Sequence, residues 1–172
     1  MIRHIQPNDY DKIIPKLDDW WGRKQMTDKL PRLFFDHFSD TSFIIEEKGL
    51  IKGFLIGFIS PANPTIGYVH FIGVNPDFRK EGIGRKLYSA FIEKAEPSGV
   101  TVIECLTSPE NRLSITFHKK IGFSIKPGDG QTEDGFMFTR NYDGPGEHRV
   151  LFNISTRKFR SVNNSSEHHE TF

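Results

Sequence analysis

Two glycines and three basic residues cluster where an apolar stretch gives way to a helical pattern. Gly82 and Gly84 leave the backbone bare, so that a ligand can approach it closely, and Arg79, Lys80 and Arg85 add positive charge. A helix that begins inside this loop directs its first backbone N–H groups and the positive end of its dipole outward. The spacing of these residues therefore predicts a diphosphate site.

Two other phosphate-binding loops do not fit this segment. No stretch of the chain reads G-x-x-x-x-G-K-[ST], which excludes the nucleoside-triphosphate loop. The dinucleotide fingerprint needs a third glycine and a place after the first strand of a β-α-β unit, and the pair Gly82 and Gly84 has neither. A glycine-rich turn that binds no ligand is the remaining alternative.

The elements that must position this loop follow from the periodicity of apolar residues. The pattern predicts strands at 2–5, 42–47, 51–60, 65–74, 100–106, 136–138 and 150–154, and helices from about 10 to 22 and at 30–38, 84–95 and 111–120. The stretch 51–60 is almost continuously apolar, which is typical of a strand covered on both faces. One strand therefore leads into the loop and one helix leaves it.

Two motifs in this order resemble a known family. Arg79-x-x-Gly82-x-Gly84 is similar to the [Arg/Gln]-x-x-Gly-x-[Gly/Ala] motif of the Gcn5-related N-acetyltransferases, the GNAT superfamily. The segment 111–123 resembles the family's second block, Asn-x-x-Ala-x-x-x-Tyr-x-x-x-Gly-Phe, and the element order also fits over roughly residues 2–154. The resemblance implies an α/β (α+β) GNAT fold, with a splayed, mixed, mostly antiparallel seven-stranded sheet and about four helices.

The resemblance also implies acetyl-CoA as co-substrate. The pantetheine arm would bond the backbone of the strand before the loop, and the loop amides would hold the diphosphate. Asn111 would contact the cofactor near the second helix. The cofactor-binding residues implied in this way are Ile72, Gly73, Val74, Arg79, Lys80, Glu81, Gly82, Ile83, Gly84, Arg85, Asn111 and Phe117.

Three residues are predicted to be catalytic. Direct transfer to an amine, without a covalent enzyme intermediate, needs a base for the amine and a proton for the leaving thiolate. His118 stands where the family usually has the Tyr that donates this proton, and a packing role is the alternative. His70 lies at an offset similar to that of an imidazole in arylalkylamine acetyltransferases, with Tyr68 two residues earlier on the same strand face. A packed polar residue is the alternative for His70.

The segment 18–23 combines acidic, aromatic and basic residues, and the resemblance places it at the acceptor pocket. Trp20, Trp21 and Arg23 are the predicted substrate-binding residues, because indole rings can bind a cationic amine. The alternative is that the two Trp cap the core. Residues 143–147 would form the opposite wall.

Composition limits the partners and the compartment. The chain has 172 residues and a net charge of +1, so we expect neither nucleic acid nor membrane binding. Cys105 is the single cysteine and the first residues lack the pattern of a signal peptide, which fits a cytoplasmic protein. We expect one domain at 1–154 and a flexible polar tail at 155–172, in which His168 and His169 are solvated rather than metal ligands. No metal site is predicted, and a homodimer remains open.

The sequence thus predicts an enzyme that transfers the acetyl group of acetyl-CoA to a primary amine of a small molecule or peptide. Two alternatives stay open. One is transfer of a different acyl group. The other is a non-catalytic acyl-CoA-binding or regulatory domain, which the absence of Tyr at position 118 keeps in play.

Overall fold

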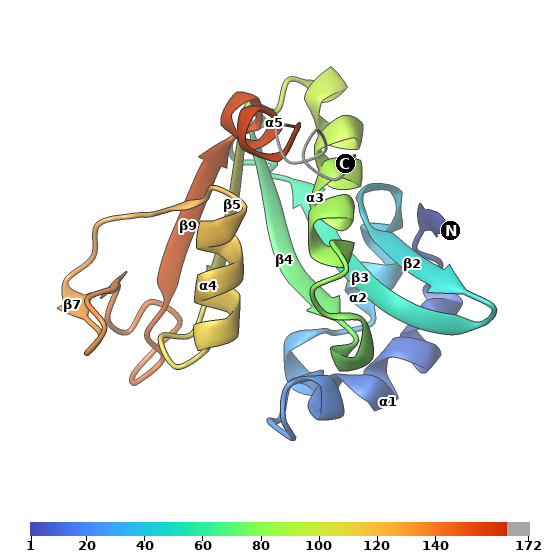
Figure 1. The fold of residues 1–172 in the computed structure, drawn as a ribbon, viewed down its shortest axis with the longest axis horizontal. Coiled ribbons are helices and arrows are strands. Elements are labelled where there is room, and N and C mark those ends of the chain that lie inside the picture. The colour runs from blue at the N-terminus through green and yellow to red at the C-terminus, as the bar shows by residue number, and fades with distance from the viewer. Residues whose placement is uncertain (165–172) are drawn as a thin grey trace, which may run out of the picture. The chain divides into compact units, whose positions relative to one another are not determined.

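The computed structural model describes residues 1–164, which fall into two compact units: the first is Met1–Gly99, and the second begins at Val100. Each unit has its own strands and helices (Figure 1). The expectation of one domain over residues 1–154 stays a prediction.

The first unit is built on four antiparallel strands, paired in the order β1-β2-β3-β4. These strands are β1 (Ile2–His4), β2 (Phe43–Glu47), β3 (Leu50–Ile59) and β4 (Ile66–Val74). The helices are α1 (Tyr10–Trp20), α2 (Leu33–His37) and α3 (Ile83–Ala95), with short 3-10 turns at Pro7–Asp9, Thr27–Lys29, Ser39–Thr41, Pro76–Phe78 and Glu96–Ser98.

Helices cover both faces of this sheet. On one face Phe54 belongs to a buried cluster with Leu17 and Trp20 of α1. On the other face α3 lies directly on β3, where a Cβ atom added to Gly57 would stand 2.6 Å from the ring of Phe91. Only glycine permits this approach, which fixes the height of α3 above the strand.

The second unit contains three antiparallel strands in the order β5-β9-β6. They are β5 (Val102–Thr107), β9 (Val150–Ser155) and β6 (Ser124–Ile125), and β7 (Gly130–Gln131) pairs with β8 (Met137–Phe138) in a separate ribbon. Its helices are α4 (Arg112–Lys120) and α5 (Thr156–Asn164).

Helix α5 corrects the expectation that the chain is a flexible tail from residue 155 onward. Thr156, Phe159 and Asn163 recur on one helical face and are all buried. The side-chain amide of Asn163 donates to the carbonyls of Ile121 and Phe159, at 3.1 and 2.8 Å. Two polar residues on the buried face hid this helix from an apolar periodicity. His168 and His169 lie outside the described residues.

The other predicted elements are present, with one shortened. The helix expected at 30–38 is confined to Leu33–His37. Leu30 precedes Pro31, and the residue before a proline disfavours the helical conformation; here it has φ −130° and ψ 69°. None of the helices within residues 1–164 is long and apolar enough to cross a membrane.

Candidate cofactor loop and acceptor wall

The loop after β4 is pinned to β3 by one asparagine. The backbone N–H of Asn75 donates to the carbonyl of Lys52 at 2.9 Å, and its side-chain amide donates to the carbonyl of Ile51 at 3.2 Å. Its Oδ1 accepts from the N–H of Asp77 at 3.1 Å, which starts the 3-10 turn. The loop therefore leaves the sheet in a fixed direction.

Helix α3 begins without a side-chain cap. Its N-cap residue is Gly82, with φ 74°, and Lys80 also has a left-handed φ of 70°. The N–H of Lys86 is bonded within the helix to the carbonyl of Gly82, so the N–H groups of the preceding turn have no helical acceptor. The Nε atom of Arg85 is buried without a hydrogen-bond partner. These donors fit the diphosphate that the sequence predicts.

Arg79 has a role that the sequence did not indicate. Its Nη2 donates to the carbonyl of Trp20, the last residue of α1, at 2.7 Å. The side chain thus caps α1, and the first residue of the glycine motif is tied to the predicted acceptor wall.

Strand β4 carries an extra residue at His70. Ile56 pairs with Phe71 but the next residue, Gly57, pairs with Val69, so His70 is left out of the register as a bulge. A bulge turns neighbouring side chains to one side. The ring centroids of His70 and Phe71 accordingly lie 6.1 Å apart. The sequence placed Tyr68 and His70 on one face but gave no sign of the bulge.

The imidazole of His70 is held from two directions. Its ring stacks on Phe34, with centroids 4.0 Å apart and planes 7° apart. Its Nε2 lies 2.7 Å from the carbonyl oxygen of Lys29. Because a carbonyl only accepts, this contact assigns the Nε2 proton and leaves Nδ1 as the basic atom of the neutral ring. Tyr68, on β4 like His70, packs on Phe58 of β3, with ring centroids 5.4 Å apart.

The two adjacent Trp residues have different environments. Trp20 is buried and its rings lie 6.1 Å from Phe54, in the core. Trp21 is half-buried, 4.9 Å from Phe71, and Arg23 is exposed with φ 64°. Of the two aromatic residues of the predicted acceptor wall, Trp21 is therefore the one that is partly exposed.

In the second unit, the start of α4 is closed by Asn111. Its Oδ1 accepts from the N–H of Ser114 at 3.1 Å, as an N-cap does. Phe117 is half-buried, with its ring 5.0 Å from that of His118. Asn111 and Phe117 are both predicted cofactor contacts. The capping bond of Asn111 uses the oxygen of its side-chain amide and not the nitrogen.

His118 lies in an apolar environment. Its side chain is 2% exposed and stacks on Phe152 at 4.9 Å, with the edge of Phe123 at 5.2 Å. Burial lowers the pKa of His118 from 6.5 to about 4, against the opposing effect of the bond to the Ser114 carbonyl. That bond, at 2.8 Å, places the proton on Nδ1. The ring is neutral at neutral pH, which favours the packing alternative over a proton-donating imidazolium.

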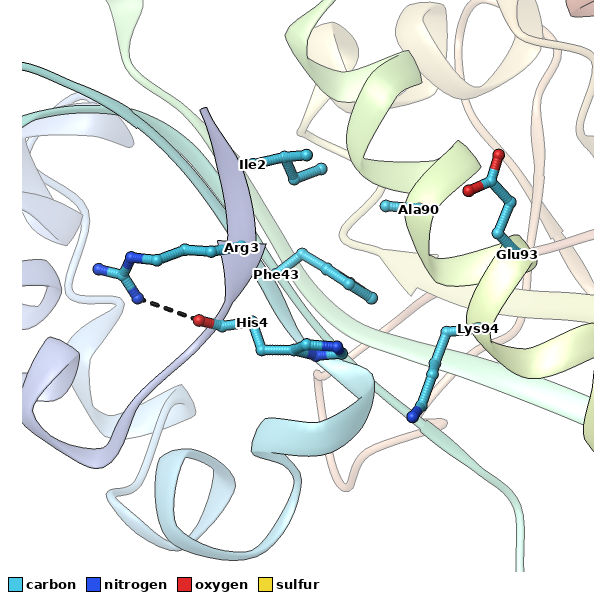
Figure 2. Close-up of a pocket in the computed structure, with 7 residues that line it drawn as sticks. All are labelled: Ile2, Arg3, His4, Phe43, Ala90, Glu93 and Lys94. Atoms are coloured by element: carbon cyan, nitrogen blue, oxygen red, sulfur yellow. Dashed lines mark hydrogen bonds between the residues drawn. The ribbon is translucent and has the colours of Figure 1, made fainter.

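A pocket of about 380 Å³ occurs elsewhere in the first unit (Figure 2). It lies between β1 and the C-terminal half of α3, whereas the glycine loop precedes the N-terminus of that helix. Its lining residues are Ile2, Arg3, His4, Phe43, Ala90, Glu93 and Lys94. None of the predicted site residues is among them.

The chain belongs to the family described as Acetyltransferase (GNAT) family, whose profile matches residues 8–123. The family resemblance inferred from the two motifs is thereby confirmed.

Two relatives with similar sequences are both named L-2,4-diaminobutyric acid acetyltransferases. The L-2,4-diaminobutyric acid acetyltransferase of Vibrio parahaemolyticus is 26% identical over 118 residues, covering 69% of this chain and 65% of that protein. That of Virgibacillus pantothenticus is 32% identical over 115 residues, 64% of this chain and 72% of that protein. The chain thus spans just under two thirds of the Vibrio protein.

A solved structure confirms the predicted fold class. The diaminobutyrate acetyltransferase of Paenibacillus lautus, in complex with L-2,4-diaminobutyric acid and coenzyme A, is 25% identical. It superposes with a TM-score of 0.64 over 92% of this chain and 95% of its own. The fold class of this chain is therefore that of the GNAT acetyltransferases.

Proposed function

We propose that this protein is an N-acetyltransferase that passes the acetyl group of acetyl-CoA directly to a primary amine. The observation that carries the proposal is the uncapped start of α3 at Gly82, with the orphaned Nε of Arg85, inside the family's glycine motif. In this proposal the amides of residues 80–85 hold the diphosphate of acetyl-CoA. The backbone of residues 72–74 holds the pantetheine, and Asn111 and Phe117 supply further contacts.

His70 is the proposed base. Its ring is oriented by Phe34 and by the Lys29 carbonyl, and Nδ1 then accepts a proton from the ammonium of the acceptor. The free amine attacks the thioester carbon, and the C–S bond breaks to release the thiolate of coenzyme A. Because burial keeps His118 neutral, we assign the proton for this thiolate to the phenol of Tyr68. The Tyr68 phenolate then regains a proton from the nitrogen of the new amide, which has one proton to lose after its attack.

We propose a small diamino acid as the acceptor to test first. The relatives named above act on diaminobutyric acid, and the partly exposed Trp21 is the indole proposed to contact its ammonium group. A peptide N-terminus or a lysine side chain is the competing acceptor class. We also place the protein in the cytoplasm, since its single thiol, Cys105, is buried and has no second cysteine, and a homodimer stays a prediction.

A non-catalytic acyl-CoA-binding domain is the second candidate. The observation that favours it is the buried, neutral His118 at the position of the family's proton-donating Tyr. In that case acyl-CoA would bind and no amine would be acylated.

The experiment combines calorimetric titration with acetyl-CoA and an assay of thiol release. The acceptors are L-2,4-diaminobutyric acid, a peptide with a free N-terminus and the same peptide with an acetylated N-terminus and one lysine. Propionyl-CoA and succinyl-CoA replace acetyl-CoA to test whether a different acyl group is transferred. Binding with thiol release and a mass increase of one acetyl group on the acceptor supports the enzyme. Binding without release from any pair favours the second candidate, and absence of binding overturns both.

A further inference from the structure

A single side chain links the glycine loop to the end of α1. Trp20 is the last residue of α1, so its carbonyl has no acceptor role within the helix, and it lies at the negative end of the helix dipole. The guanidinium of Arg79 donates to this carbonyl at 2.7 Å. A cation at this position is the capping group that helix electrostatics favour.

The residue after the capped carbonyl is Trp21, whose ring is closely fitted to β4. It lies 4.9 Å from Phe71, and a Cβ atom added to Gly73 would stand 2.7 Å from its Cη2. A movement of the last turn of α1 therefore changes the position of this indole over β4. The segment that follows turns through left-handed conformations at Gly22 and Arg23 and is exposed. The N–H groups of Arg23 and Met26 donate to the carbonyl and the Oδ1 of Asp18 at 2.6 and 2.9 Å, so this segment moves together with the last turn of α1.

Arg79 retains the capacity to bind an anion. A guanidinium has several N–H donors in a planar fork, and the bond to Trp20 uses one nitrogen. Arg79 stands three residues before Gly82, in the loop whose amides and cations fit a diphosphate, and is itself exposed. One guanidinium can thus contact the ligand and the α1 carbonyl together.

We propose that Arg79 is a positioning residue that couples occupancy of the diphosphate loop to the acceptor wall. When coenzyme A binds, Arg79 bridges its diphosphate and the Trp20 carbonyl, which fixes the end of α1 and holds Trp21 over Phe71 and Gly73. The acceptor then meets a formed wall only after the cofactor has bound. This inference rests on the proposed function, because it needs coenzyme A in the loop.

The two Trp residues of the chain make the coupling visible. A Trp20→Phe background leaves Trp21 as the sole indole emitter and keeps an aromatic ring in the core. In this background Arg79→Ala removes the bridge. Lys80→Ala is the matched control, because it removes one loop cation whose side chain is not bonded to α1. Arg79→Gln restores a donor for the Trp20 carbonyl without the charge. Calorimetry gives the affinity for coenzyme A, and Trp21 emission is read at saturation.

Saturating coenzyme A is expected to change Trp21 emission in the background protein and to the same extent in Lys80→Ala, although Lys80→Ala binds about tenfold more weakly. Arg79→Ala should bind coenzyme A yet lose most of the emission change, and Arg79→Gln should recover part of it. An unchanged emission response in Arg79→Ala, or none in the background protein while calorimetry shows binding, overturns the coupling and leaves the proposed function intact. Failure of the unmodified chain to bind coenzyme A overturns both.

Discussion

Helices α3 and α4 each follow a strand and each carries one motif of the family, but only α4 has a side-chain N-cap. Helix α3 starts at Gly82, which has no side chain to accept from the first N–H groups. Helix α4 starts at Asn111, whose Oδ1 accepts from the N–H of Ser114. An open start offers its donors to an external anion, whereas a capped start has already satisfied one of them. The comparison supports the proposal that the diphosphate binds at α3, and it gives Asn111, the N-cap residue of α4, a stabilising role.

The two histidines predicted to be catalytic differ in exposure: one can be reached by a substrate and the other is buried. His70 is partly exposed at a strand bulge, and its ring is oriented by a carbonyl and an aromatic face. His118 is 2% exposed and is surrounded by Phe rings that lower its pKa to about 4. An accessible, oriented imidazole can exchange a proton with a substrate, and a desolvated one is kept neutral. The difference separates a candidate base from a core residue.

The largest effect should come from placing a carboxylate at the open helix start. Gly82→Asp is compared with Gly82→Asn, which has the same shape and no charge. A Cβ atom at Gly82 meets no neighbouring atom, and both side chains are good N-caps that tolerate a left-handed φ. Repulsion between the carboxylate and a diphosphate near 4 Å is about 4 kcal/mol, so coenzyme A should bind about a thousandfold more weakly to Gly82→Asp than to Gly82→Asn. Calorimetry measures both affinities, and equal values would remove the diphosphate from this loop.

Sequence patterns predicted the secondary structure from β4 through the glycine loop to α3 well, because the signals for these elements lie in neighbouring residues. The strand that ends at Val74, the glycine loop after it and the helix that ends at Ala95 were predicted from residue types within a few positions, whereas the left-handed φ of Gly82 was not predicted. The fold class followed from the resemblance to the GNAT family, with which the order of these elements agrees. The structure therefore changed little in the predicted course of the chain from β4 to α3.

The remaining features depend on partners distant in sequence. The bulge at His70 is set by the register with β3, and nothing in the neighbouring residues marks it. Trp20 is buried against Phe54, and its carbonyl is capped by the guanidinium of Arg79, 59 residues away. The burial of His118 requires Phe152 of β9. Periodicity cannot report contacts of this kind, which is why the sequence did not predict the surroundings of His70, Trp20 and His118.

Replacing His70 tests the accessible histidine. His70→Gln keeps a donor for the Lys29 carbonyl but has no basic nitrogen, so kcat for acetyl transfer should fall about 100-fold with KM for acetyl-CoA nearly unchanged. Phe34→Leu is the control, since it removes the stacked ring and leaves the base in place. Steady-state thiol release measures both variants. Similar kcat values for His70→Gln and the unmodified chain would return His70 to the packing alternative.

Acid should destabilise the chain through the buried histidine. Because the pKa of His118 is depressed in the folded state, the unfolded chain binds the extra proton, so this stability is complete above pH 6.5 and is lost as pH falls toward 4. His118→Phe keeps an aromatic ring and cannot titrate, so its free energy of unfolding should not fall through this group. Between neutral pH and about pH 5, the unmodified chain should therefore lose about 2 kcal/mol of stability that His118→Phe keeps. Urea unfolding at both pH values measures this, with the exposed His37→Gln as control. A parallel pH dependence of His118→Phe and the unmodified chain would contradict the assignment, and loss of thiol release in a folded His118→Phe would restore the catalytic role.

The smallest effect separates the two roles of Asn111. Asn111→Ala removes the bond to the Ser114 N–H and should lower the free energy of unfolding by about 1 kcal/mol, whereas Asn111→Ser keeps a good N-cap and should lose little. Neither variant keeps the side-chain amide nitrogen, the atom that remains for a cofactor. If Asn111 only caps α4, Asn111→Ser should bind coenzyme A as the unmodified chain does. If it also contacts the cofactor, both variants should bind more weakly and to the same extent, because both lack the same donor. Thermal unfolding and calorimetry on the two variants therefore decide whether the capped helix start shares in the ligand site or leaves the ligand to α3.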